Sequence, residues 1–62
     1  MGNIKLNYEK FEIGELATLN KGLRGECTVR VVYQTTGKMY CRISHDGLCA
    51  EWEVMTNRLA KI

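Results

Sequence analysis

Alternation of apolar and polar residues runs through most of this chain and constrains its fold more than any other feature. Apolar residues occupy every second position from Cys27 to Tyr33, in a run rich in β-branched side chains. Successive side chains of a β-strand point to opposite faces, so this period of two predicts a strand with one buried face. A helical period is poorly matched throughout the sequence. The chain is therefore expected to be all-β.

Similar patterns predict further strands around this one. The expected strands cover residues 16–19, 27–34, 39–44, 48–54 and 59–62. Residues 20–26 contain two glycines, an asparagine and three charges, which indicates a loop. Residues 55–58 lack alternation and suit a single helical turn before the last strand. Alternation from Ile4 to Tyr8 predicts an N-terminal arm or short strand over residues 1–10, ahead of the domain proper.

The turn between the second and third strands sets which of their residues face one another. A two-residue loop would oppose Val31 to Arg42 and mix the apolar and polar faces. A three-residue loop over residues 35–37, ending with Gly37 in the left-handed region, keeps the two faces apart. The expected pairs are then Gln34 with Lys38, Tyr33 with Met39, Val31 with Cys41, and Val29 with Ile43, the last three facing the core.

The same register would gather basic and aromatic residues on the outward face of this hairpin. The expected outward pairs are Arg30 with Arg42, Val32 with Tyr40, and Thr28 with Ser44. Two opposed arginines repel weakly, so such a face suits either water or an acidic partner. A tyrosine beside two arginines is also the arrangement that stacks a base and contacts phosphate in single-strand-binding barrels. The full set of candidate binding residues is Arg30, Tyr40, Arg42, Lys21, Arg24 and Arg58.

Three stretches of residues 11–62 resemble the SH3-like barrel. Phe11–Leu19 is similar to its opening, Gly25–Val31 to its second strand, and Trp52–Ile62 to its ending of strand, helical turn and last strand. The resemblance implies a small five-stranded barrel with one short helical turn before the last strand. It implies no single function, because translation, transcription, signalling and phage or mobile-element proteins share these motifs.

Two departures separate the chain from the signalling SH3 domains. Residues 16–20 contain no aromatic side chain, and Arg58 occupies the place of the tyrosine in the helical turn. A polyproline helix docks against aromatic walls, so binding of proline-rich peptides is not expected. The proline-free chain is most similar to small phage-type or mobile-element proteins.

Size and charge limit the classes of function. The 62 residues allow one domain with a thin core. Nine Lys and Arg against seven Asp and Glu give a net charge of +2, which is too mild to mark a nucleic-acid-binding protein by itself. The longest apolar runs, such as Val31–Tyr33, are too short to cross a bilayer, so no membrane contact is expected.

Three cysteines and one histidine raise the question of metal or nucleophilic chemistry. An odd cysteine count without a secretory signal predicts reduced thiols and a cytoplasmic protein. Four soft ligands could hold Zn²⁺, but no C-x-x-C pair occurs, so small buried hydrophobes are the favoured interpretation. Nothing supplies an oxyanion hole for a Cys–His pair, and we expect no cofactor and no enzyme activity. The four residues considered as ligands are Cys27, Cys41, His45 and Cys49.

These observations predict a small binding or adaptor module that engages a protein partner. Self-association, with a homodimer as the product, is included because an unpaired sheet edge or the arm at residues 4–8 would gain from a second strand. The alternative is a nucleic-acid-binding module that uses the basic and aromatic face of the central hairpin. Trp52 alternates with Ala50 and Val54 and is expected in the core and not on a ligand platform.

Overall fold

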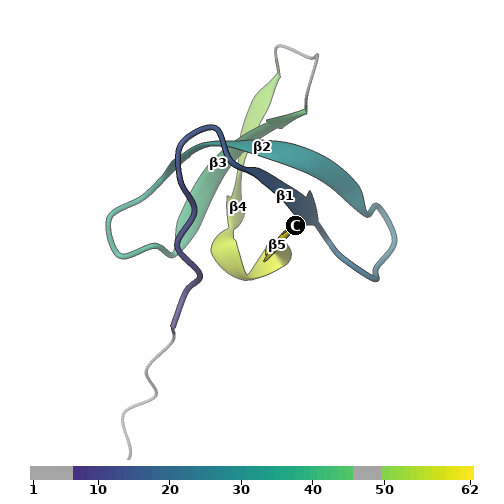
Figure 1. Cartoon of the computed structure of the whole chain (residues 1–62), viewed down its shortest axis with the longest axis horizontal. Helices are drawn as coiled ribbons and strands as arrows, with labels where there is room; N and C mark the ends of the chain where they lie inside the picture. The colour runs from purple at the N-terminus through teal and green to yellow at the C-terminus, as the bar shows by residue number, and fades with distance from the viewer. Residues whose placement is uncertain (1–6, 46–49) are drawn as a thin grey trace, which may run out of the picture.

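The computed structural model describes residues 7–45 and 50–62 of the chain. It contains five antiparallel strands in one sheet and a single turn of 3-10 helix, as Figure 1 shows. The elements are β1 (Leu16–Leu19), β2 (Cys27–Gln34), β3 (Tyr40–His45), β4 (Glu51–Met55), η1 (Thr56–Arg58) and β5 (Leu59–Lys61). The predicted all-β class and the helical turn before the last strand are confirmed. No helix in these residues has the length and apolar character to cross a membrane.

The strands follow the order β4-β3-β2-β1-β5. Strand β1 pairs with β2, β2 with β3, and β3 with β4, and β5 returns to pair with β1. Within the described residues β4 and β5 do not pair with each other, so the expected closed barrel is wrong and the sheet is open. The turn η1 connects the two edge strands, where closure would require a ladder of hydrogen bonds between them. The predicted arm at residues 1–10 falls largely outside the described residues, and residues 7–10 are not in a strand.

The core lies on one face of the sheet and follows the alternation of the sequence. Its buried members are Phe11, Ala17, Leu19, Val29, Val31, Cys41, Ile43 and Leu59. Trp52 and Val54 of β4 and Cys27 of β2 are partly buried and pack against this cluster, so Trp52 contacts the core as expected but is not fully buried. Phe11 comes from the irregular segment before β1 and caps the cluster from outside the sheet. Each large apolar side chain here contributes roughly 1.5–3 kcal/mol by leaving water.

The β2–β3 loop is longer than predicted. Thr35 donates its backbone N–H to the Tyr40 carbonyl at 2.9 Å, so residues 36–39 form the loop. Gly37 has the expected positive φ of 87°, but Lys38 follows it in the left-handed region with φ 66°. This second left-handed residue extends the turn, because a three-residue loop needs only one. The predicted pairing of Gln34 with Lys38 is therefore wrong.

A β-bulge at Val32 then shifts the pairing of β2 with β3. On one side of the bulge Val29 lies opposite His45 and Val31 opposite Ile43; on the other side Tyr33 lies opposite Arg42 and Gln34 opposite Cys41. An extra residue in one strand exchanges the faces of the residues that follow it. Tyr33 consequently points outwards and Gln34 inwards. The expected burial of Tyr33 and Met39 is wrong, since both are exposed, whereas Val29, Val31, Cys41 and Ile43 are buried as predicted.

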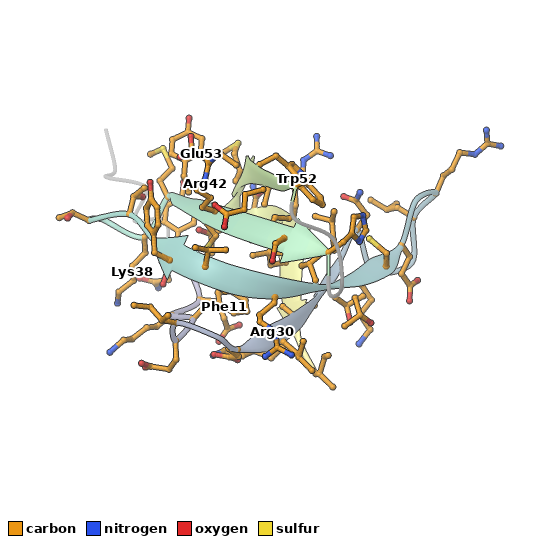
Figure 2. All side chains as sticks on the ribbon, turned by 90° about the horizontal axis from the view of Figure 1, so that it is seen from above. Phe11, Arg30, Lys38, Arg42, Trp52 and Glu53 are labelled. Carbon is orange, nitrogen blue, oxygen red and sulfur yellow. The ribbon has the colours of Figure 1, made fainter. Side chains whose placement is uncertain are left out.

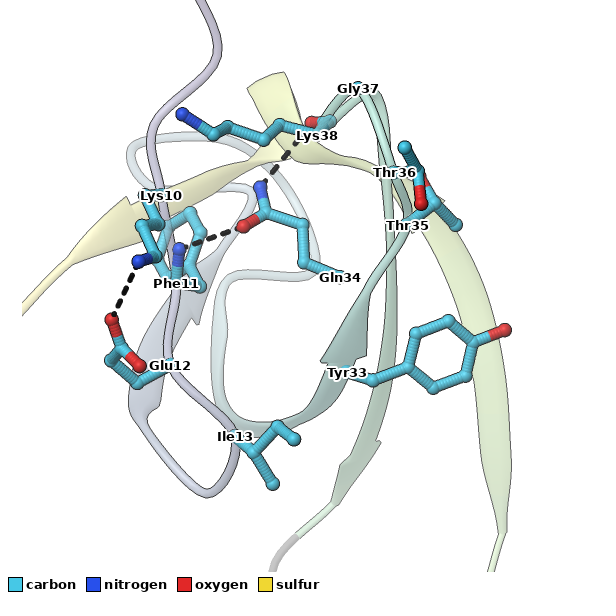
Figure 3. A pocket seen from close by; sticks show the side chains of 10 residues that line it. All are labelled: Lys10, Phe11, Glu12, Ile13, Tyr33, Gln34, Thr35, Thr36, Gly37 and Lys38. Carbon is cyan, nitrogen blue, oxygen red and sulfur yellow. Dashed lines mark hydrogen bonds and ion pairs between the residues drawn. The ribbon is translucent and has the colours of Figure 1, made fainter.

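Gln34 joins three separate parts of the chain. Its Oε1 accepts the Phe11 N–H at 2.9 Å, and its Nε2 donates to the Glu9 carbonyl at 2.7 Å and to the Lys38 carbonyl at 3.3 Å. Figure 3 shows this side chain between the N-terminal segment and the β2–β3 loop, with Tyr33 directed away. Buried Thr56 lies beside it and donates its hydroxyl to the same Lys38 carbonyl. The amide therefore fixes the segment that carries Phe11 onto the sheet.

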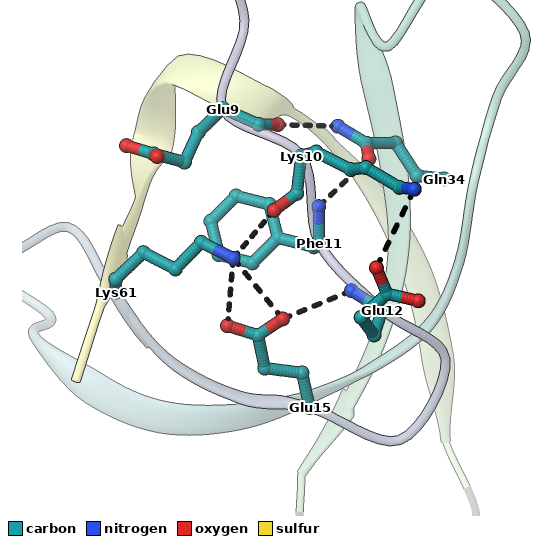
Figure 4. A network of polar contacts seen from close by, with 7 residues as sticks. All are labelled: Glu9, Lys10, Phe11, Glu12, Glu15, Gln34 and Lys61. Atoms are coloured by element: carbon teal, nitrogen blue, oxygen red, sulfur yellow. Dashed lines mark hydrogen bonds and ion pairs between the residues drawn. The ribbon is translucent and has the colours of Figure 1, made fainter.

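A second tether holds this segment to β5. Lys61 Nζ donates to the Lys10 carbonyl, lies 3.0 Å from Glu15 Oε2, and sits 4.6 Å from the centre of the Phe11 ring (Figure 4). Glu15 also accepts the Glu12 N–H at 2.9 Å. The Glu12 N–H and then the Lys61 ammonium stabilise the ionised carboxylate and lower the pKa of Glu15.

Replacing Gln34 by Leu is expected to reduce the free energy of unfolding by about 1–3 kcal/mol, because the Phe11 N–H and the Glu9 carbonyl lose their partner, while the Lys38 carbonyl keeps only the Thr56 hydroxyl. Urea denaturation followed by Trp52 fluorescence measures the loss. The control is Thr36→Ala, an exposed position two residues further on in the β2–β3 loop, and it should change stability little. An unchanged midpoint for Gln34→Leu would show that the amide does not hold the segment.

Replacing Glu15 by Gln keeps an acceptor for Glu12 N–H and removes only the charge. Since the pKa of Glu15 is lower in the folded state, its stabilisation is present above the unfolded-state pKa and disappears as pH falls through the folded-state pKa. We expect Glu15→Gln to melt below the wild type at neutral pH and the two curves to converge in acid. Glu12→Gln is the control, because its ion pair with Lys10 is largely exposed. A constant difference in melting temperature at all pH values would contradict this role.

Candidate functional site

The outward side of strands β2, β3 and β4 carries the largest aromatic side chains that the fold leaves exposed. Tyr40 lies opposite Met55, and Arg42 lies between Tyr33 and Glu53. Tyr33 is 42% exposed, Tyr40 40% and Met55 38%. We call this surface the outer face and define it by Tyr33, Tyr40, Arg42, Glu53 and Met55. The bulge at Val32 adds Tyr33 to this face, because without the extra residue Tyr33 would point to the core.

The charge of Arg42 is compensated within this surface. Its Nε lies 3.1 Å from Glu51 Oε1, and Glu53 faces it across the β3–β4 ladder. Figure 2 shows Arg42 beside Glu53 over these strands. One arginine between two glutamates leaves no excess of positive charge here. The outer face is therefore amphipathic, with tyrosine and methionine around a compensated guanidinium group.

The predicted pair of Arg30 with Arg42 does not form. Arg30 lies opposite Ser44 on one side and Leu16 on the other, and its Nη1 donates to the Gly14 carbonyl at 2.8 Å. In Figure 2 it lies towards β1, apart from Arg42. The other two predicted outward pairs are also wrong, since Ser44 lies opposite Arg30, and the Tyr40 carbonyl accepts the Thr35 N–H beyond the bulge. The cause in each case is the longer loop together with the bulge, which move β3 along β2.

The three remaining candidates lie around the β1–β2 loop. Lys21 and Arg24 are exposed in residues 20–26, and Arg58 is the last residue of η1. Lys21 and Arg58 line a hollow of about 400 Å³ between this loop, η1 and β5. We call this part of the molecule the basic end and define it by Lys21, Arg24 and Arg58. The six predicted residues therefore do not form one surface. Tyr40 and Arg42 belong to the outer face, Arg30 is hydrogen-bonded to the Gly14 carbonyl, and the other three form the basic end.

A second hollow of about 310 Å³ lies between the N-terminal segment and the β2–β3 loop (Figure 3). Ile13 and Tyr33 contribute its apolar lining, and Lys10 and Lys38 are among its polar residues. Gln34 is committed to holding its two sides together. This hollow is therefore the space that remains beside the Gln34 tether, and its central polar side chain is not available to a ligand.

The cysteine and histidine side chains are not arranged as the predicted register placed them. That register would set Cys27 opposite His45, but His45 lies opposite Val29, with its ring centre 5.0 Å from that of Trp52. In residues 7–45 and 50–62 no three metal-ligating side chains form a group; Cys49, one of the four considered, lies outside these residues.

Cys41 is fully buried, with its Sγ 3.4 Å from Thr56 Oγ1. Burial raises the pKa of the Cys41 thiol, and the contact with Thr56 opposes this shift only in part. Nucleophilic cysteines need thiolate character and access to solvent. Cys41 has neither property and serves the core.

Sequence reasoning missed Tyr33, Glu53 and Met55 as members of a surface. One signal was available for Tyr33: the run Val31-Val32-Tyr33 places three apolar residues in succession and so breaks the alternation. Such a break is compatible with a bulge, because the extra residue changes the face of the residues that follow it. Comparisons of the chain with protein-family models, with curated proteins and with solved structures found no match.

Proposed function

We propose that this chain is a non-enzymatic module that binds a protein partner through the outer face. The observation that carries the proposal is the exposure of Tyr33, Tyr40 and Met55 around an arginine whose charge is already compensated. Tyrosine, methionine and arginine are the side chains enriched where protein interfaces are most buried. Tyrosine also loses little conformational entropy on binding and offers both an apolar ring and a hydroxyl group.

The charges of the outer face favour a protein over a nucleic acid at this surface. A nucleic-acid backbone is recognised through an excess of positive charge, with release of counterions. Glu51 and Glu53 beside Arg42 would repel phosphate groups. A protein surface with its own polar rim meets such a face without an electrostatic penalty. Nucleic-acid binding by the chain stays a prediction, but the outer face does not favour it.

We further propose that the architecture is related to the SH3-like barrels in an open form. The strand order and the helical turn between the last two strands support this kinship. The binding mode differs from that of signalling SH3 domains, because residues 16–20 carry no aromatic side chain and Arg58 occupies the tyrosine position. The kinship with phage or mobile-element proteins and the cytoplasmic location stay predictions.

Self-association remains a second candidate because two strand edges are available. In the described residues β4 pairs only with β3, and β5 only with β1. Unpaired edges add strands readily. Sedimentation velocity over a range of concentrations would then show a species of twice the monomer mass, while a monomer at the highest concentration would exclude the homodimer.

Substitution of the two tyrosines tests the proposed interface. Tyr33→Ala with Tyr40→Ala is expected to weaken binding of the partner at least about tenfold, because tyrosine is enriched among the few interface residues whose truncation costs about 2 kcal/mol or more. Ile62→Ala is the matched control, since it removes an apolar side chain that is 77% exposed beyond β5. A partner captured by the wild type is purified, and its affinity for each variant is measured by calorimetry.

The double variant must keep the melting temperature of the wild type for this comparison to hold, and both tyrosines are exposed enough to expect that. Unchanged affinity in a folded double variant would overturn the assignment of the outer face. Equal losses in the double variant and in Ile62→Ala would overturn it as well, since any apolar surface would then serve.

A further inference from the structure

Ion pairing differs among the basic residues of the described part of the chain. The ion pairs between two described side chains are Lys10 with Glu12, Arg42 with Glu51, and Lys61 with Glu15. Lys21, Arg24 and Arg58 form no ion pair with any carboxylate of residues 7–45 and 50–62. The positive charge that the fold leaves uncompensated therefore includes the whole basic end.

The hollow at the basic end is lined without a carboxylate. Its lining consists of Asn20, Lys21, Leu23, Asn57, Arg58 and Ala60. Two cations and two side-chain amides supply hydrogen-bond donors, while Leu23, 68% exposed, supplies apolar contact. This combination of donors and cations suits an anionic group carried on an apolar stem.

Hydrogen bonds hold the walls of the hollow in place before any ligand arrives. The Asn20 N–H donates to the Arg58 carbonyl at 2.9 Å, and Arg58 Nη1 donates to Asn20 Oδ1 at 3.5 Å. The loop is closed internally, because the Leu23 N–H donates to the Asn20 carbonyl at 2.9 Å and the Gly22 N–H to Glu26 Oε1 at 2.9 Å. Fixed walls reduce the ordering cost of binding.

We propose that this hollow binds the carboxylate groups of an acidic peptide segment. The lining contains no aromatic side chain on which a base could stack, so single-stranded nucleic acid would gain only phosphate contacts there. A glutamate side chain offers both the carboxylate for Lys21 and Arg58 and a methylene stem for Leu23. The inference rests on the proposed function in one respect, since an acidic segment of a protein partner is the natural source of this ligand.

The test uses the full chain labelled with ¹⁵N and three probes: capped hexaglutamate, capped hexaglutamine, and an oligothymidylate of the same charge as hexaglutamate. Hexaglutamate is expected to shift the backbone amide signals of Asn20, Asn57 and Arg58 at low salt, and hexaglutamine is not. Lys21→Gln with Arg58→Gln should weaken hexaglutamate binding at least about fivefold, as expected for loss of two partly exposed charge contacts. Lys10→Gln removes one positive charge, from an exposed ion pair away from the hollow, and should change the affinity less than about twofold.

A second variant covers the case in which loss of the Arg58 hydrogen bond unfolds the loop. Leu23→Asp leaves both cations in place and puts a negative charge in the hollow, so it should abolish hexaglutamate binding while the chain stays folded. The proposal is overturned if hexaglutamate does not bind, if Leu23→Asp binds it normally, or if the oligothymidylate binds more tightly. The variant Tyr33→Ala with Tyr40→Ala should still bind hexaglutamate, because it leaves the basic end unchanged. Loss of hexaglutamate binding therefore tests the basic end, and loss of partner binding in the tyrosine variant tests the outer face.

Discussion

The extra residue in β2 at Val32 and the Gln34 side chain that it turns inwards determine how the rest of this molecule is assembled. A chain of this size buries a thin core, and its irregular segments need polar tethers in addition to apolar contact. The Gln34 amide satisfies a donor at Phe11 and acceptors at Glu9 and Lys38, which belong to two segments far apart in sequence. Phe11 can cap the core only because its own backbone is held in this way.

The same shift produces the proposed interface. When the bulge turns Gln34 towards the core, it turns Tyr33 towards solvent, where Tyr33 joins Tyr40 and Met55. Stability and surface are therefore coupled through one backbone irregularity. A variant that removed the bulge would place a tyrosine in the core and a glutamine on the outer face, and would lose the tether and the aromatic surface together.

Much of the fold was predictable because alternation reports which face a residue occupies. Ala17, Leu19, Val29, Cys41 and Ile43 are buried as the pattern indicated, and residues 56–58 form the expected turn. The register of β2 with β3 was not predictable in the same way, because it depends on the length of the loop between them and on the bulge, which alternation does not report. A second left-handed residue, Lys38, is not one that turn preferences favour, and it lengthened the loop.

Errors of register affect the surface more than the core. At Val29 and Val31 the register differs from the expected one by two residues, which keeps each side chain on its face, so this part of the core was predicted correctly although the cross-strand neighbours changed. Arg30 and Arg42 were separated for this reason. Beyond the bulge the difference is three residues, and there Tyr33 changed face. The basic end was less sensitive, because Lys21 and Arg58 meet through the loop and η1 and not through the β2–β3 ladder.

The outer face and the basic end differ in charge, and they would therefore have different roles in the binding of one partner. The outer face is compensated and aromatic, and contacts of that kind mainly slow dissociation. The basic end carries uncompensated cations, which act at longer range, accelerate encounter and orient the partner. With a net charge of only +2, the chain would attract an acidic partner through this local excess and not through its overall charge. Because the cations are held by the β1–β2 loop and η1, and the tyrosines by β2 and β3, a partner that contacts both surfaces would be fixed in one orientation.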